Sequence, residues 1–287
     1  MKIGFIGQGY VGKNYADDFE NRGYEIVRYA LEEPYKENVK EIAECDIVFI
    51  TVPTYTNKGK VDDSIVKDVI KNVADNSIAV IKSTVLPGAT EEIQDENPRI
   101  YVMHSPEFLR ESAVHYDVAH PSRNIVGIPE KSGAYEEAAR QVLSVLPRAP
   151  YQKVCSSKES ELIKYAGNCF LYSKVVFMNL IYDISYEIGA DYYTVAEAVG
   201  VDPRIGESHM VTLHKSGPTG CKEGRGTGGN CFIKDFVVFR DFFEDKIKDE
   251  KSRNVLKSIE EKNIDLLKQS EKDLDILKKV YGDEFSL

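Results

Sequence analysis

One cysteine directly follows a glycine-rich turn in the segment GTGGNCFIKD, residues 226–235. Glycines carry no side chains, so a substrate can approach the backbone closely and the Cys231 sulfur stays accessible. Lys234 and Asp235 follow a few residues later, and a nearby cation favours the thiolate, which is the form that attacks carbon. The segment therefore predicts a nucleophilic thiol at Cys231.

A glycine pattern near the amino terminus is a second chemical signal. The motif GQGYVG at residues 7–12 fits GxGxxG, with an apolar strand at 2–6 before it and a helical pattern at 10–22 after it. The three glycines permit a tight turn, approach of a pyrophosphate, and close packing of helix on strand, while the helix N-terminus offers amide groups. We predict that a dinucleotide is held by Gly7, Gly9, Tyr10, Val11 and Gly12.

The choice between NAD and NADP depends on the end of the second predicted strand, residues 24–29. An acidic residue is expected there to bind the adenosine ribose, but Ala30 occupies the position. Glu32, two residues later, can reach the ribose instead. Alternatively, Arg28 or Lys36 meets a 2′-phosphate, which would favour NADP. We expect NAD.

The wider pattern predicts an α/β fold over residues 1–152. Further apolar strand candidates lie at 46–52, 78–82, 99–103 and 124–128. Residues 62–73 form a predicted helix between two of them. Alternation of strands and helices predicts a Rossmann-type, doubly wound parallel sheet.

The pattern changes after residue 150 and predicts an α-helical domain over residues 153–287 that carries Cys231. Residues 158–189 contain no proline and read as one long central helix with a broad apolar face. Such a face packs in a core or against a second copy, so we expect a homodimer through this helix. Residues 203–231 read as loop, and 232–281 return to charged helix.

Composition excludes several classes of protein. The net charge of −10 argues against a nucleic-acid partner. There is no run of roughly 18 apolar residues to span a membrane, and the start lacks a signal-peptide core. Five scattered cysteines without a CxxC pair argue against a metal site and a disulfide scaffold. We expect a cytoplasmic protein, in which the thiol stays reduced.

Six motifs in order carry a resemblance to a known family. They are VPT at 52–54, KSTV at 82–85, SPEFLRE at 105–111, ELIKYAGN at 161–168, DPRIG at 202–206, and the Cys231 segment. Over residues 1 to about 240 the chain resembles the UDP-glucose/GDP-mannose dehydrogenase family, most of all its members that act on UDP-glucose. The resemblance implies NAD-dependent oxidation of a nucleotide-sugar C6 alcohol to the uronate, through a thiohemiacetal and a thioester on Cys231.

The resemblance also implies roles for individual residues. The catalytic residues would be Cys231, Lys164, Asn168, Asp235, Thr84 and Glu111. Cofactor contacts beyond the glycine motif would be Glu32, Pro53, Thr54, Ser83, Thr84 and Glu111. Substrate contacts would be Glu107, Phe108, Leu109, Lys164, Asn168, Arg204 and Gly228, with Arg204 reaching across a dimer interface. Lys164 and Asn168 are four residues apart, so on a helix they share a face that suits an oxyanion.

The chain departs from the family in length and in the glycine-rich turn. Relatives continue into a domain that binds the nucleotide, and we expect that domain to be absent here. Thr227 stands where relatives carry an aromatic residue, and Ile233 where a proline is common. Loss of remote contacts lowers turnover as well as affinity. Two alternatives therefore stay open: an NAD-binding protein of low activity that needs a partner chain, and a one-step hydroxy-acid dehydrogenase that needs no thiol.

Overall fold

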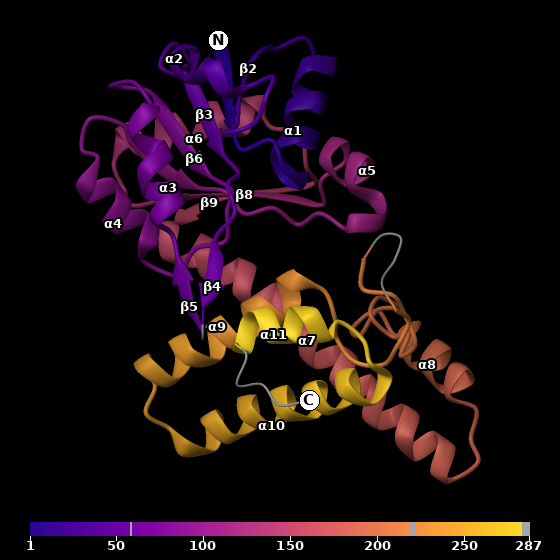
Figure 1. Cartoon of the computed structure of the whole chain (residues 1–287). Coiled ribbons are helices and arrows are strands. Elements are labelled where there is room, and N and C mark those ends of the chain that lie inside the picture. Colours follow the sequence, from indigo (N-terminus) through magenta and orange to yellow (C-terminus); the bar gives the residue numbers. More distant parts are fainter. Residues whose placement is uncertain (58, 218–221, 283–287) are drawn as a thin grey trace. The chain divides into compact units, whose positions relative to one another are not determined.

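The structure is a computed structural model that describes residues 1–57, 59–217 and 222–282 (Figure 1). The chain divides into two compact units. The first comprises Met1–Tyr55 and Val61–Lys164, and the second comprises Thr56–Lys60 and Tyr165–Leu287. The predicted domain boundary at residue 152 stays a prediction.

A seven-stranded sheet forms the centre of the first unit. Its strands, in spatial order, are β2 (Glu25–Tyr29), β1 (Lys2–Ile6), β3 (Ile47–Ile50), β6 (Ile78–Ile81), β7 (Tyr101–His104), β8 (Arg123–Ile128) and β9 (Tyr151–Ser156). β7 and β8 pair antiparallel, while the other neighbouring pairs of this sheet are parallel. The predicted Rossmann-type sheet is confirmed, and β9 is a strand that the sequence pattern did not predict.

Helices cover both faces of this sheet, as a doubly wound fold requires (Figure 1). They are α1 (Tyr10–Asn21), α2 (Val39–Ile42), α3 (Ser64–Val69), α4 (Ala89–Glu96), α5 (Val114–Ala119) and α6 (Gly133–Val145), with short 3₁₀ turns η1 (Lys36–Asn38), η2 (Ile70–Asn72) and η3 (Glu111–Ala113). Successive strand residues face opposite sides. Phe5 therefore packs with Phe19 and Phe49 in one core, whereas Ile6 lies in the other.

A short hairpin follows β3. It comprises β4 (Tyr55–Asn57) and β5 (Lys60–Asp62), and residues 56–60 at its tip belong to the second unit. The sequence pattern did not predict it.

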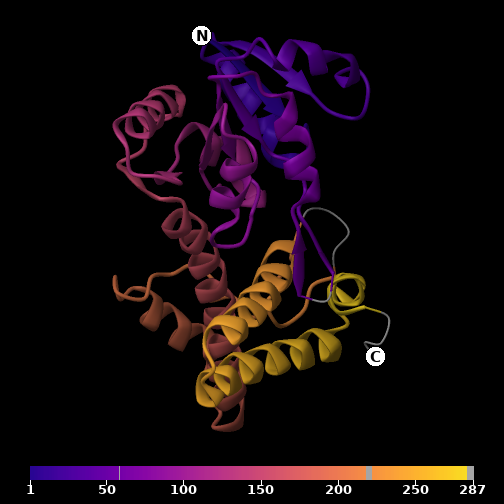
Figure 2. The same cartoon turned by 90° about the vertical axis from the view of Figure 1, so that its left-hand side faces the viewer.

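Helices make up the second unit. They are α7 (Ser157–Glu187), which begins in the first unit, α8 (Tyr192–Gly200), α9 (Asn230–Lys246), α10 (Glu250–Ser270) and α11 (Leu274–Tyr281). α9, α10 and α11 pack on one another, in orange to yellow in Figures 1 and 2. The long helix predicted at 158–189 is confirmed as α7, and the charged segment after it is divided among three helices.

The long connection between α8 and α9 is fixed to α7 by two cations. Lys174 donates to the carbonyl oxygens of Ile205 and Gly206 at 3.0 and 2.8 Å. Arg225 donates to Asn179 Oδ1 at 2.8 Å. A segment that the composition predicts to be loop is thus anchored to the helix at Ile205, Gly206 and Arg225.

Candidate functional site

The glycine-rich turn after β1 has the shape that a dinucleotide requires. Gly7 adopts a φ of +94°, which side chains disfavour. A Cβ on Gly9 would meet no atom within 4 Å, so the turn is open there, whereas a Cβ on Gly12 would clash with the Gly7 carbonyl oxygen and Thr51 Oγ1. These observations fit a bound pyrophosphate at Gly9 and close helix packing at Gly12.

Thr51 holds this turn in place, a role that sequence reasoning missed. Its hydroxyl lies 2.9 Å from the carbonyl oxygens of both Ile6 and Gly7. The residue directly follows β3, which is the neighbour of β1 in the sheet. Thr51 directly precedes the VPT motif at 52–54, and this position could have indicated that it lies near the cofactor site.

Residues after β3 and β6 that were predicted to contact the cofactor lie together. Thr54 Oγ1 donates to the carbonyl oxygen of Thr84 at 2.9 Å, and Ser83 Oγ donates to that of Val52 at 2.6 Å. Pro53 lies between these contacts in the chain. The strand order reverses between β1 and β3, and ligands of open α/β sheets bind at such a point, beyond the carboxyl ends of the strands.

The end of β2 shows the surroundings of two residues, Arg28 and Glu32, that the sequence proposed for the ribose. Arg28 is buried and forms ion pairs with Asp17 at 2.7 Å and Glu20 at 2.6 Å, both on α1. The positive charge of the Arg28 guanidinium is therefore already paired with two carboxylates. Glu32 lies exposed in the turn after β2, as a residue that reaches a ribose must.

The segment that carries Glu111 approaches the glycine-rich turn. The Tyr10 hydroxyl donates to the carbonyl oxygen of Arg110 at 3.1 Å. Glu111 begins η3 directly afterwards. The structure thus brings Tyr10 and the start of η3 together across 100 residues of sequence.

Glu107 and Lys164 form a buried ion pair in the first unit. Lys164 Nζ donates to Glu107 Oε1 at 2.7 Å and to its carbonyl oxygen at 2.9 Å, while the Leu109 amide donates to Oε2 at 2.8 Å. Burial by itself raises the pKa of Glu107, but the Lys164 charge and these hydrogen bonds outweigh it, and the pKa falls below 4.5. Both residues were predicted to bind substrate.

A second lysine, Lys82, contacts the start of the segment that contains Glu107. Lys82 is buried, donates to the Ser105 carbonyl oxygen at 3.1 Å, and lies 4.5 Å from the centre of the Tyr15 ring. Burial lowers its pKa to about 8. His104 beside it is fully buried, and its pKa falls to about 3 because of burial and the nearby Lys82 charge.

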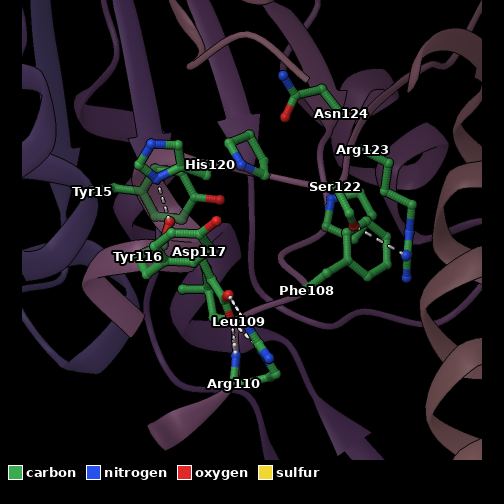
Figure 3. A pocket seen from close by; sticks show the side chains of 12 residues that line it. Tyr15, Phe108, Leu109, Arg110, Tyr116, Asp117, His120, Ser122, Arg123 and Asn124 are labelled. Atoms are coloured by element: carbon green, nitrogen blue, oxygen red, sulfur yellow. Dashed lines mark hydrogen bonds and ion pairs between the residues drawn. The ribbon is translucent and has the colours of Figure 1, made fainter. Parts of the chain in front are cut away.

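A pocket of about 340 Å³ adjoins this segment (Figure 3). Phe108 and Leu109, two predicted substrate residues, line it, and the Arg123 guanidinium lies 3.7 Å from the centre of the Phe108 ring. Figure 3 shows Asp117 across the pocket, paired with Arg110 at 2.5 Å. Sequence reasoning missed Arg123, which begins β8.

Cys231 lies exposed in the first turn of α9, whose N-cap is Gly229. The N-terminus of a helix favours a thiolate, because unpaired amides and the helix dipole stabilise negative charge. Lys234, the cation expected nearby, lies 3.4 Å from Asp235 Oδ1. The other cysteines of the described chain, Cys45, Cys155 and Cys169, are buried or partly buried.

Two predicted catalytic residues meet in the second unit. Asn168 on α7 donates from Nδ2 to Asp235 Oδ2 on α9 at 2.6 Å. Asp235 is almost completely buried, and its Oδ1 makes no hydrogen bond within the described residues. A buried acceptor in this state is suited to orient a water molecule.

Two further predicted substrate residues lie in the connection between α8 and α9. Arg204 is 87% exposed and pairs with Asp202 at 2.6 Å, so it projects from the surface. Gly228 has no room for a side chain, because a Cβ there would clash with Ser216 Oγ and Asp273 Oδ2. Internal packing thus explains this glycine, and its contact with substrate stays a prediction.

Comparison with known proteins identifies the chain. Residues 33–145 match the NAD binding domain of the UDP-glucose/GDP-mannose dehydrogenase family, and residues 158–264 match its central domain. The chain belongs to this family. The match confirms NAD, the cofactor predicted from the sequence.

Several proteins of this dehydrogenase family are similar to the chain over most of its length. The UDP-glucose 6-dehydrogenases of Rhizobium meliloti and Rickettsia prowazekii are 32% and 30% identical over 83% and 90% of it. A solved UDP-glucose dehydrogenase from Pyrobaculum islandicum is 28% identical and superimposes with a TM-score of 0.75, over 91% of this chain and 68% of that one. The chain spans 62% and 66% of the two curated relatives.

No helix in the described part of this family member is long and apolar enough to cross a membrane.

Proposed function

We propose that the chain contributes to the NAD-dependent oxidation of a nucleotide-sugar C6 alcohol to the uronate, with UDP-glucose giving UDP-glucuronate, through covalent catalysis by Cys231. The observation that carries the proposal is the bond from Asn168 to Asp235, four residues beyond the exposed thiol on the same helix. A nucleophile, an amide donor and a buried carboxylate are the groups that thioester chemistry needs.

The first oxidation removes a hydride from C6 and a proton from its hydroxyl, and gives the aldehyde. NAD, when bound, supplies the hydride acceptor, and we assign its contacts to the glycine-rich turn, Glu32, Pro53, Thr54, Ser83 and Glu111. The Lys164 ammonium and the Asn168 amide then stabilise negative charge at the C6 oxygen. Glu107, which holds Lys164 at 2.7 Å, fixes the direction in which that ammonium points.

The thiol completes the reaction. Cys231 Sγ forms a bond to C6, and a second hydride and a proton leave to give a thioester. Water, oriented by Asp235 and Thr84, attacks the thioester carbon, and the C–S bond breaks with the electron pair on sulfur. The overall balance is one alcohol, one water and two NAD to one carboxylate, two NADH and three protons.

We further propose that two copies of the chain associate through α7. The large apolar side chains exposed on this helix include Phe170, which is 69% exposed, Phe177, which is 58% exposed, and Ile184, which is 51% exposed. Exposed apolar faces of this kind favour association. Arg204, which projects outward, would then reach the substrate of the second copy. Sedimentation of a monomer at micromolar concentration contradicts this assembly.

NADH release in the presence of UDP-glucose, GDP-mannose or UDP-N-acetylmannosamine tests the function. We expect two NADH per UDP-glucose in the wild type, and no formation of the uronate in Cys231→Ser. Cys155→Ser is the matched control, because Cys155 is partly buried and burial raises its pKa to about 11. Full activity of Cys231→Ser on a hydroxy acid would identify a one-step dehydrogenase. NAD binding without turnover of any nucleotide sugar would identify an NAD-binding protein that needs a partner.

A further inference from the structure

The loop that precedes the proposed nucleophile is packed by side chains from the far end of the chain. This loop, residues 224–229, is called the nucleophile loop below. A Cβ on Gly224 would lie 2.6 Å from Ser270 Cβ, and one on Gly226 would lie 3.0 Å from Asn263 Oδ1. Contacts with α10 and the residues that follow it therefore leave little room for a side chain at Gly224 or Gly226.

Lys272 lies between α10 and α11 and is completely buried. Its side chain contacts the nucleophile loop. Its Nζ lies 3.0 Å from the Gly226 carbonyl oxygen, 3.3 Å from that of Gly224 and 3.1 Å from His214 Nε2. An ammonium group can donate one hydrogen to each of these acceptors. A lysine ammonium only donates, so Nε2 accepts and His214 is neutral, in keeping with a pKa that burial and the Lys272 charge lower.

Asp273, the next residue, holds the other end of the nucleophile loop. Its Oδ2 accepts a hydrogen bond from the Gly229 amide at 2.9 Å. Gly229 is the N-cap of α9 and has a φ of +84°, and Cys231 follows two residues later. The carboxylate therefore fixes the backbone at the point where the helix of the thiol begins.

The backbone on both sides of Lys272 is unusual. Glu271 and Asp273 adopt left-handed conformations with φ of 50° and 53°. Residues other than glycine seldom adopt this conformation, and it persists where the surrounding contacts over-determine it. With this backbone, two consecutive side chains contact opposite ends of the nucleophile loop: Lys272 contacts Gly224 and Gly226, and Asp273 contacts Gly229.

We propose that Lys272 and Asp273 are positioning residues that hold the nucleophile loop and, through it, the orientation of Cys231 on α9. A buried ammonium is costly unless its hydrogen bonds are satisfied, so the loop and the lysine stabilise one another. The inference rests on the proposed function only for the role of the thiol, because the contacts themselves involve no substrate.

Two measurements on the full chain test it without turnover. Amide hydrogen exchange of a peptide covering residues 222–232 reports the loop, and we expect exchange at least tenfold faster in Lys272→Met and Asp273→Ala. Asp273→Asn keeps an acceptor oxygen and should retain near wild-type exchange. Lys278→Met and Asp275→Ala, both exposed on α11, are the matched controls. Equal exchange in the variants and the controls would overturn the inference.

The pH profile of Cys231 alkylation by iodoacetamide is followed on the peptide that contains Cys231. It tests whether Lys272 and Asp273 orient the thiol or only stabilise the fold. Asp273→Ala loses the hydrogen bond to the Gly229 amide, so the midpoint of its profile should shift from that of the wild type, whereas Asp273→Asn, which keeps an acceptor oxygen, should keep the wild-type midpoint. Asp275→Asn should leave it unchanged. An unmoved midpoint in Asp273→Ala contradicts the inference, and the Asp273 variants decide alone if Lys272→Met does not fold.

Turnover adds a third result where the wild type is active. We expect kcat for UDP-glucose to fall at least tenfold in Asp273→Ala, with the KM for NAD within twofold of wild type. A wild type that releases no NADH from any nucleotide sugar refutes the proposed function, while exchange and alkylation still decide the role of the loop.

Discussion

Asn168 donates a hydrogen bond to Asp235 at 2.6 Å, and this bond joins α7 to α9 one turn beyond the proposed nucleophile. The amide of Asn168 thereby fixes the orientation of a carboxylate that is almost wholly buried. The other oxygen of Asp235 makes no hydrogen bond within the described residues and lies 3.4 Å from Lys234 Nζ.

Removal of this donor should impair the reaction more than the fold. In Asn168→Ala we expect kcat to fall by about 10²-fold or more, because both the oxyanion donor and the orientation of Asp235 are lost. The free energy of unfolding should fall by about 1–3 kcal/mol, since Oδ2 loses a buried partner. Ser173→Ala on the same helix is the control, and equal loss of activity in both variants would contradict the assignment.

The second and third glycines of the fingerprint, Gly9 and Gly12, should respond differently to substitution by alanine. Gly12→Ala should lower the free energy of unfolding by about 1–3 kcal/mol, because the new methyl group clashes with the Gly7 carbonyl oxygen and Thr51. Gly9→Ala has open space and should change stability by less than about 0.5 kcal/mol. We nevertheless expect Gly9→Ala to weaken NAD binding at least tenfold by calorimetry. Unchanged NAD affinity would place the pyrophosphate elsewhere.

Lys82 should make stability depend on pH in the alkaline range. Its pKa is about 8 in the folded chain against 10.5 for an ordinary lysine, so between these values the unfolded chain binds the proton that the folded chain has released. Stability from this group therefore rises with pH, by about 3 kcal/mol in total, and is constant below pH 8.

Urea unfolding of wild type and Lys82→Met at pH 7.5 and 10.5 measures this effect. Wild-type stability should gain about 3 kcal/mol relative to Lys82→Met over the interval. Lys71→Met, whose lysine is 68% exposed, should behave as wild type. A stability difference between wild type and Lys82→Met that stays constant across the interval would show that Lys82 keeps an ordinary pKa.

Arg28 should have no part in choosing the cofactor. Its guanidinium is paired with Asp17 and Glu20, so Arg28→Leu should leave the ratio of NAD to NADP affinity within twofold, measured by calorimetry. Glu32→Ala should weaken NAD binding, because a carboxylate accepts from both ribose hydroxyls. A selective loss of NADP affinity in Arg28→Leu would show that the ion pairs open to admit a 2′-phosphate.

The first unit illustrates what local pattern can predict. β1, the glycine turn and α1 are contiguous, so strand periodicity, turn chemistry and helix spacing all act within about 20 residues. The motif after β3 and the motif after β6 could be expected to meet, because parallel strands end at one edge. β9 was missed because half of its residues are exposed and polar, and α8 was missed because it has only nine residues.

Contacts between distant segments were not predictable in the same way. Arg28 was interpreted as a possible phosphate ligand, because nothing in its neighbourhood showed that α1 supplies two carboxylates. Lys272 and Asp273 appeared in a charged segment with the composition of a solvated helix. Their partners lie 44 to 58 residues away in sequence, and no periodicity relates them.

The sequence by itself determined the family, the cofactor and the residue types available for chemistry, because these depend on short motifs whose members are close in the chain. Only the tertiary structure decided which charges are already paired and which side chains hold the loop before Cys231. The physical reason is that burial and hydrogen-bond geometry arise from packing between segments far apart in sequence. The composition around Lys272 predicts an exposed lysine, whereas in the fold this lysine is buried and donates to the carbonyl oxygen of Gly226 in the nucleophile loop.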